Sequence, residues 1–150
     1  MKKLNFAIII GLIIASILLV SCSNERVDDY IPAGYASTDG NTDFGKDLTE
    51  TYYYKYDSMP TLNEKYVAVI DDNKQSVIDA INICYGNFNE TRNSELANQV
   101  TNGDYYILTA YNSDGTEKEF DSTEQFEDTN FKLYFFDTEN NTLHYIYCAW

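Results

Sequence analysis

Nucleophilic or redox chemistry in this 150-residue chain depends on three cysteines and one histidine, its most reactive side chains. Cys84 and Cys148 can form a disulfide. Alternatively, Cys84 can act as a thiol nucleophile with His144 as its base and an acid or Asn140 orienting the ring. Four residues of strand would separate His144 from Cys148 by about 13 Å, so a Cys84 bonded to Cys148 could not reach the histidine. The two arrangements therefore exclude each other. We expect the disulfide, and therefore no catalytic residue.

The position of Cys84 on a predicted helix favours this pairing. Val77, Ile81 and Cys84 are spaced to share one helix face, so the thiol should face a sheet and not water. Cys84 also lies near the C-terminal end of that helix, where the helix dipole does not lower a thiol pKa. The bridge would close a loop of about 65 residues and contribute about 4 kcal/mol. Two buried free thiols are the alternative to this bridge. The alternative to a catalytic His144 is a partly exposed strand residue beside a turn.

Other catalytic and metal motifs lack their minimum parts. The chain has no Gly-x-Ser-x-Gly, phosphate loop or His-Glu-x-x-His, so we expect no cofactor and no metal site. One stretch resembles an EF-hand loop, although Phe44 occupies the position that needs glycine and neither flank has a helical pattern. That stretch is at most a weak calcium candidate, with oxygen ligands at Asp39, Asn41, Asp43, Asp47 and Glu50.

Tyrosines are the remaining candidates for a binding site. Fourteen are present, and several alternate along two predicted strands. Alternate side chains face opposite sides of a sheet, so one set can fill the core while the other forms an aromatic stripe suited to a sugar or a protein. Ordinary cross-strand packing is the alternative. The candidate ligand-binding residues are Tyr52, Tyr54, Tyr56, Tyr105 and Tyr111.

The elements that must position these residues indicate an α+β domain at 48–150. Apolar residues at spacings of three and four predict a helix from the Asp72-Asn73 cap to Gly86, and a shorter one from Ser94 to Asn102. Residues rich in strand formers predict an antiparallel sheet of about five to six strands, with both helices packed on one face. The expected strands are 52–56, 66–70, 104–111, 116–120, 131–137 and 143–150.

The N-terminus has the pattern of an export signal. Lys2 and Lys3 precede an uncharged run at 6–20, whose helix of about 22 Å is too short for the roughly 30 Å hydrocarbon core. The segment Leu19-Val20-Ser21-Cys22 at its end resembles the lipobox of bacterial lipoproteins. An ordinary secretory signal with a chance cysteine is the alternative.

The lipobox resemblance implies a signal peptide at 1–21, cleavage before Cys22, diacylglycerol on the Cys22 sulfur, and a third acyl chain such as palmitate. Two or three acyl chains anchor a protein firmly. The resemblance therefore implies a protein fixed to the cell membrane or outer membrane, facing the periplasm or the cell exterior. Residues 22–47 are polar, without a sustained period, and we expect them to form a flexible acidic linker.

Charge narrows the possible partners. The chain has 24 acidic and 10 basic residues, a net charge of −14, which excludes a nucleic-acid partner. We expect a non-catalytic accessory domain of the cell envelope that binds a protein or a glycan through its sheet. The alternatives are an inhibitor or immunity-type lipoprotein, a structural spacer, and a cysteine-dependent envelope hydrolase that uses Cys84 and His144.

Overall fold

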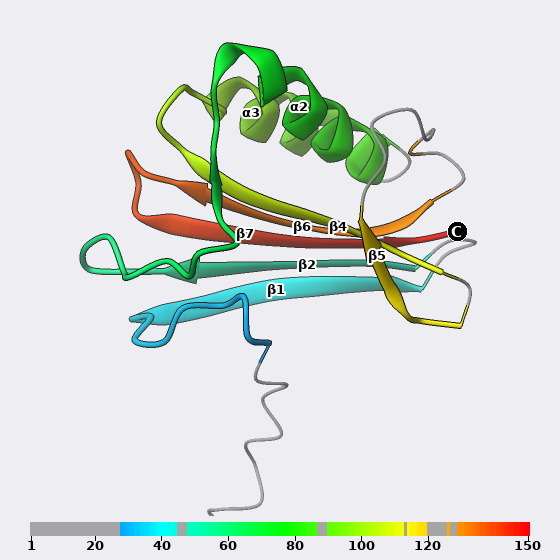
Figure 1. Cartoon of the computed structure of the whole chain (residues 1–150), viewed down its shortest axis with the longest axis horizontal. Coiled ribbons are helices and arrows are strands. Elements are labelled where there is room, and N and C mark those ends of the chain that lie inside the picture. Colours follow the sequence, from blue (N-terminus) through cyan, green and yellow to red (C-terminus); the bar gives the residue numbers. More distant parts are fainter. Residues whose placement is uncertain (1–27, 45–47, 87–89, 113, 120–125, 127–128) are drawn as a thin grey trace, which may run out of the picture.

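A single antiparallel sheet carries the fold (Figure 1). In this computed structural model, the described residues are 28–44, 48–86, 90–112, 114–119, 126 and 129–150. Six of the sheet's seven strands follow the order β1-β2-β7-β6-β4-β3, and the seventh, β5, pairs with β4 beside this path. The strands are β1 (Ser37–Phe44), β2 (Leu48–Lys55), β3 (Val67–Ala68), β4 (Tyr105–Tyr111), β5 (Glu117–Glu119), β6 (Asn130–Asp137) and β7 (Thr142–Ala149).

Two helices complete the fold, α2 (Asp71–Gly86) and α3 (Glu90–Gln99). The predicted fold class, an antiparallel sheet combined with two helices, is confirmed. Helix α2 begins at Asp71, so the predicted cap residues Asp72 and Asn73 lie in its first turn, where the Asn73 side chain accepts a hydrogen bond from the backbone N–H of Ile70 at 2.9 Å. Helix α3 begins at Glu90, four residues before the predicted start at Ser94. Within the described part of the chain, no helix has the length and apolarity needed to cross a membrane.

The predicted boundary between linker and domain is wrong. Strand β1 lies inside the range expected to be a flexible linker, and it pairs with β2 along its whole length, from Ser37 opposite Lys55 to Phe44 opposite Leu48. Before it, Tyr30, Ile31 and Tyr35 pack against buried residues of the sheet. The described fold therefore begins at Asp28 and not at residue 48.

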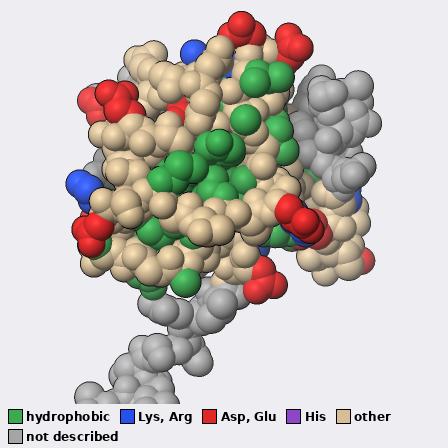
Figure 2. Space-filling model, turned by 60° about the vertical axis from the view of Figure 1, so that its left-hand side comes forward, with side chains coloured by type: hydrophobic (Ala, Val, Ile, Leu, Met, Phe, Trp, Pro, Cys, Tyr) green, Lys and Arg blue, Asp and Glu red, His purple; other side chains and the backbone are tan. Residues whose placement is uncertain are grey.

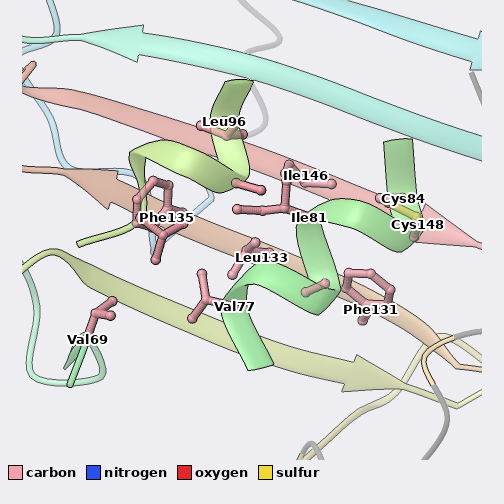
Figure 3. Close-up of a cluster of buried hydrophobic side chains, with 13 residues drawn as sticks. Val69, Val77, Ile81, Cys84, Leu96, Phe131, Leu133, Phe135, Ile146 and Cys148 are labelled. Atoms are coloured by element: carbon pink, nitrogen blue, oxygen red, sulfur yellow. A yellow bond between two sulfur atoms is a disulfide. The ribbon is translucent and has the colours of Figure 1, made fainter. Parts of the chain in front are cut away.

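One hydrophobic cluster joins the helices to one face of the sheet (Figure 3). Helix α2 contacts β6 and β7, and its face with Val77, Ile81 and Cys84 is buried, as the spacing predicted. Burying a side chain of this size contributes about 1.5–3 kcal/mol. The fully buried sheet residues of this cluster are Phe131, Leu133, Phe135 and Ile146.

The opposite face of the sheet is rich in tyrosine, and we call it the tyrosine face. Its buried residues are Tyr56, Tyr66, Ile107, Tyr134, Phe136, Leu143 and Tyr145. Part of this face is covered by the segment 30–35. The hydroxyl of Tyr56 donates a hydrogen bond to the carbonyl of Pro32 at 2.7 Å, and the hydroxyl of Tyr66 donates one to the carbonyl of Tyr30 at 2.7 Å. Both sides of the sheet are therefore packed.

Candidate functional site

The five tyrosines singled out from the sequence share one side of the sheet. Strand register places Tyr52 opposite Tyr145, Tyr105 opposite Phe136 and Tyr111 opposite Asn130, all with side chains on the tyrosine face. The predicted open stripe is nevertheless wrong for two of them, because Tyr56 is buried and Tyr54 is covered. Tyr56 is only 4% exposed, and Tyr35 covers Tyr54 edge-on with a ring separation of 5.1 Å.

What stays open on this side is a hollow of about 710 Å³, which we call the tyrosine hollow. Of the five predicted tyrosines, Tyr111 lines it. The other walls come from the start of the described chain, the loop before β3, β5 and the middle of β6. Its lining residues are Asp28, Asp29, Tyr30, Asn63, Glu64, Lys65, Tyr111, Glu117, Lys132 and Tyr134.

Tyr30 occupies one wall of the tyrosine hollow and is held from two sides. The Lys65 ammonium donates a hydrogen bond to the Tyr30 hydroxyl at 2.6 Å, and that hydroxyl donates to Glu117 at 3.1 Å. The bond to Tyr30 raises the pKa of Lys65, so the lysine stays charged. The Tyr30 ring also meets Tyr134 edge-on at 5.2 Å. These contacts fix an aromatic ring in place before any ligand arrives.

Lys132 supplies the second positive charge in the hollow. Its ammonium lies 3.7 Å from the Asp28 carboxylate and 5.0 Å from the centre of the Tyr111 ring, within cation–π distance. Four carboxylates and two ammonium groups line the hollow, so its net charge is negative. It combines aromatic faces with hydrogen-bond acceptors and donors, which suits an uncharged polyhydroxylated ligand.

A second hollow, of about 550 Å³, lies on the helix side of the sheet. It is lined by Asp39, Gly40, Asn41, Tyr53, Glu95, Leu96, Gln99 and His144. His144 is 7% exposed, which corrects the expectation of a partly exposed residue, and neither ring nitrogen has a hydrogen-bond partner among the described residues. Burial lowers the His144 pKa to about 4, although Asp137 and Asp104 oppose the shift. The ring is therefore neutral near pH 7.

The cysteine pair is placed as the sequence predicted. Cys84 on α2 and Cys148 on β7 lie with their sulfurs at bonding distance and their Cα atoms 5.8 Å apart (Figure 3). This Cα separation is ordinary for a disulfide. His144 is four residues before Cys148 on the same strand and contacts Tyr53 and Phe135, whose ring centres lie 5.2 and 5.8 Å from its own. The structure thus joins Cys84 to Cys148 and places aromatic rings around His144.

The calcium candidate does not form a binding loop. Asp39, Asn41 and Asp43 lie on β1, and Glu50 lies on β2 opposite Thr42. An extended hairpin holds these residues in two paired rows, whereas an EF-hand loop curls around its ion. Asp47 lies outside the described residues. Within the described part of the chain, no group of three or more His, Cys, Asp or Glu side chains could hold a metal ion.

Most residues that line the tyrosine hollow were not predicted from the sequence. Asp28 and Tyr30 fell inside the expected linker, and Lys65 and Glu117 showed no pattern of their own. A signal did exist at Lys132, which lies between Phe131 and Leu133 and is the one polar residue of β6 apart from the two at its ends, Asn130 and Asp137. A charged residue at that position indicates that the face it occupies is open at one point.

The chain was also compared with protein-family models, with curated proteins and with solved structures. None of these comparisons found a match.

Proposed function

We propose that this chain is a membrane-anchored lipoprotein of the bacterial envelope whose domain binds a saccharide in the tyrosine hollow without catalysing a reaction. The observation that carries the proposal is the convergence of Tyr30 and Tyr111 with charged side chains around one hollow. These residues come from distant parts of the sequence. The fold brings them together on the tyrosine face.

The chemistry of the hollow matches that of a sugar. A pyranose ring has an apolar C–H face that packs on aromatic rings, and hydroxyls around its edge that both donate and accept hydrogen bonds. Carboxylates such as Asp29 and Glu64 accept from hydroxyls, and Lys132 donates to them. Tyr111 supplies an aromatic ring beside these groups, with the Lys132 ammonium over one face at 5.0 Å from the ring centre.

The proposed location at a membrane rests on the lipobox at 19–22. Acylated Cys22 would fix the domain to the cell membrane or outer membrane, facing the periplasm or the exterior. A net charge of −14 discourages contact with anionic phospholipid headgroups and favours uncharged ligands.

A non-catalytic role is supported by the state of the reactive side chains. Bonded to Cys148, Cys84 has no thiolate to offer as a nucleophile. His144 is buried and no described group orients its ring by a hydrogen bond, whereas a general base needs both access to substrate and an orienting partner. The cysteine-hydrolase alternative therefore lacks support in the described residues.

One observation favours a second candidate, a protein partner. The segment between β2 and α2 exposes Met59 (47%), Val67 (51%) and Ile70 (51%). Figure 2 shows hydrophobic side chains gathered in the middle of the side on which this segment lies, with charged side chains at the margin. Val67→Glu and Ile70→Glu would weaken binding to a protein and leave saccharide binding unchanged.

A glycan array probed with the purified lipidated protein in detergent tests the saccharide proposal. We expect a defined set of glycans to bind, and Tyr111→Ala to weaken their binding about tenfold or more, a loss of about 1.4 kcal/mol. Tyr52→Ala is the matched control, because Tyr52 lies on the same face outside the hollow. Binding that is equally strong in both variants, or an array without any bound glycan, would reject the proposal.

A further inference from the structure

The start of the described chain is fixed at the rim of the tyrosine hollow. Asp28 lines the hollow, accepts a hydrogen bond from the Tyr134 hydroxyl and lies 3.7 Å from the Lys132 ammonium. Two residues later, Tyr30 forms part of the wall. The chain therefore enters the fold on the tyrosine face, opposite the face that α2 and α3 cover.

The distance from this entry point to the proposed anchor is short. Asp28 follows Cys22 by six residues, and six residues span at most about 20 Å even when fully extended. A linker reaching to residue 47, as the sequence suggested, would have left the domain free to turn in any direction. With the entry point at Asp28, the hollow stays within about 20 Å of the acylated residue.

We propose that the tyrosine hollow faces the membrane that carries the anchor, and that its occupant is the uncharged saccharide headgroup of a glycolipid in that membrane. This inference rests on the proposed function, because it concerns the same hollow. It specifies the saccharide as a glycolipid headgroup and the membrane as its source. A lipid of the same bilayer is within reach of the hollow, because six residues keep Asp28, at its rim, within about 20 Å of the acylated residue.

Charge and side-chain type select a neutral headgroup. The carboxylates of Asp28, Asp29, Glu64 and Glu117 outnumber the two lysines of the hollow, so an anionic phosphate would be repelled. Asp28, 3.7 Å from Lys132, balances the charge of that lysine and weakens its attraction for an anion, while the ammonium has further N–H donors for a hydroxyl. Tyrosine is favoured at the boundary between membrane and water, where one side of the ring is apolar and its hydroxyl is wet. A hexose on diacylglycerol offers hydroxyls to the acids and a C–H face to the rings.

Orientation is tested with the lipidated full chain in phosphatidylcholine vesicles that carry an acceptor dye on their headgroups. A donor dye is placed at Glu64→Cys, on the rim of the hollow, or at Asn98→Cys, exposed on α3. We expect the donor at position 64 to lie closer to the bilayer by about 10 Å or more, the spacing of two packed layers. A 20-residue Gly/Ser insertion between Arg26 and Val27 should remove this difference. Equal distances without the insertion, or a closer donor at position 98, would overturn the proposal.

Ligand identity is tested with the mature chain, residues 22–150, carrying Cys22→Ser, which has neither the apolar run at 6–20 nor acyl chains, so that retention on vesicles reports binding by the folded domain. The vesicles are phosphatidylcholine alone, or with 10 mol% of mono- or dihexosyl diacylglycerol containing glucose or galactose. We expect co-sedimentation with at least one glycolipid vesicle and not with phosphatidylcholine, lost about tenfold in Tyr111→Ala but not in Tyr52→Ala. No retention on any of the four overturns the inference.

The two proposals fail in distinguishable ways. Glycans on the array that bind through Tyr111, with no retention on glycolipid vesicles, would leave the proposed function standing and overturn the membrane-facing assignment. No binding in either assay would remove both.

Discussion

The hydroxyl of Tyr134 in the central strand β6 donates a hydrogen bond to the carboxylate of Asp28, which lies 106 residues earlier in the chain. Burial raises the pKa of Tyr134, and the bond to Asp28 raises it further, so the phenol stays protonated and remains a donor at neutral pH. This contact holds the start of the described chain on the tyrosine face. It therefore connects the stability of the fold with the shape of the hollow.

Removing either partner of this bond should destabilise the domain. Tyr134→Phe and Asp28→Asn are each expected to lower the free energy of unfolding by about 1–3 kcal/mol, because the first removes the donor and the second removes the charge that strengthens this bond and pairs with Lys132. Urea unfolding of both variants and of the double variant measures their coupling. Asp29→Asn, at an exposed neighbouring carboxylate, is the control and should change little. Strictly additive effects of the two substitutions would contradict a direct interaction.

Gly40 should resist substitution because of Tyr52. A Cβ atom at position 40 would lie 2.1 Å from Cδ1 of Tyr52 and 2.7 Å from the carbonyl oxygen of Thr51. We expect Gly40→Ala to lower the free energy of unfolding by about 1–3 kcal/mol through overpacking. Thr38→Ala, two residues away on the same edge strand, should be nearly neutral. The double variant Gly40→Ala/Tyr52→Ala should recover part of the loss; thermal unfolding without any recovery would refute the role of Tyr52.

His144 predicts a loss of stability in mild acid. The unfolded histidine takes up a proton as the pH falls below about 6.5, whereas the folded one stays neutral until about pH 4. The free energy of unfolding should therefore fall between these two pH values, by roughly 3 kcal/mol in total from this group. His144→Phe should reduce the slope in this window and leave the remaining dependence, due to carboxylates, in place. Identical pH profiles for both proteins would show that His144 is not buried as a neutral ring.

The cysteine pair can be tested in protein purified from its natural source without a reducing agent. We expect no free thiol at Cys84 or Cys148 when the unreduced protein is denatured and titrated. Cys84→Ser/Cys148→Ser should lower the free energy of unfolding by about 4 kcal/mol, the chain-entropy value for a loop of about 65 residues. Two titratable thiols in the natural protein would instead support buried free cysteines and reopen the nucleophile hypothesis.

Local sequence patterns predicted the elements that form the core. The spacing of Val77, Ile81 and Cys84 predicted the buried face of α2, and alternation predicted β4, β6 and β7. These elements bury large apolar side chains, so the hydrophobic period dictates them directly. The coarse fold follows from the same patterns.

Strand β1 and the tyrosine hollow had no such local signal. The sequence Ser37–Phe44 is polar because it forms an edge strand that pairs with β2 alone and is exposed over most of its length. Its position depends on pairing with a distant segment and on the close approach of Tyr52 to Gly40. The hollow likewise joins Asp28 to Lys132 across most of the chain, a contact that only the tertiary fold determines.

The proposed saccharide site is tested most directly by two-dimensional NMR of the isotope-labelled lipidated protein in micelles, titrated with a glycan that binds on the array. We expect saturable shift changes concentrated at Tyr30, Tyr111 and Lys132, and no change at the residues of the second hollow near His144. Changes confined to the second hollow, around Asp39 and Gln99, or spread over the surface without saturation would contradict it.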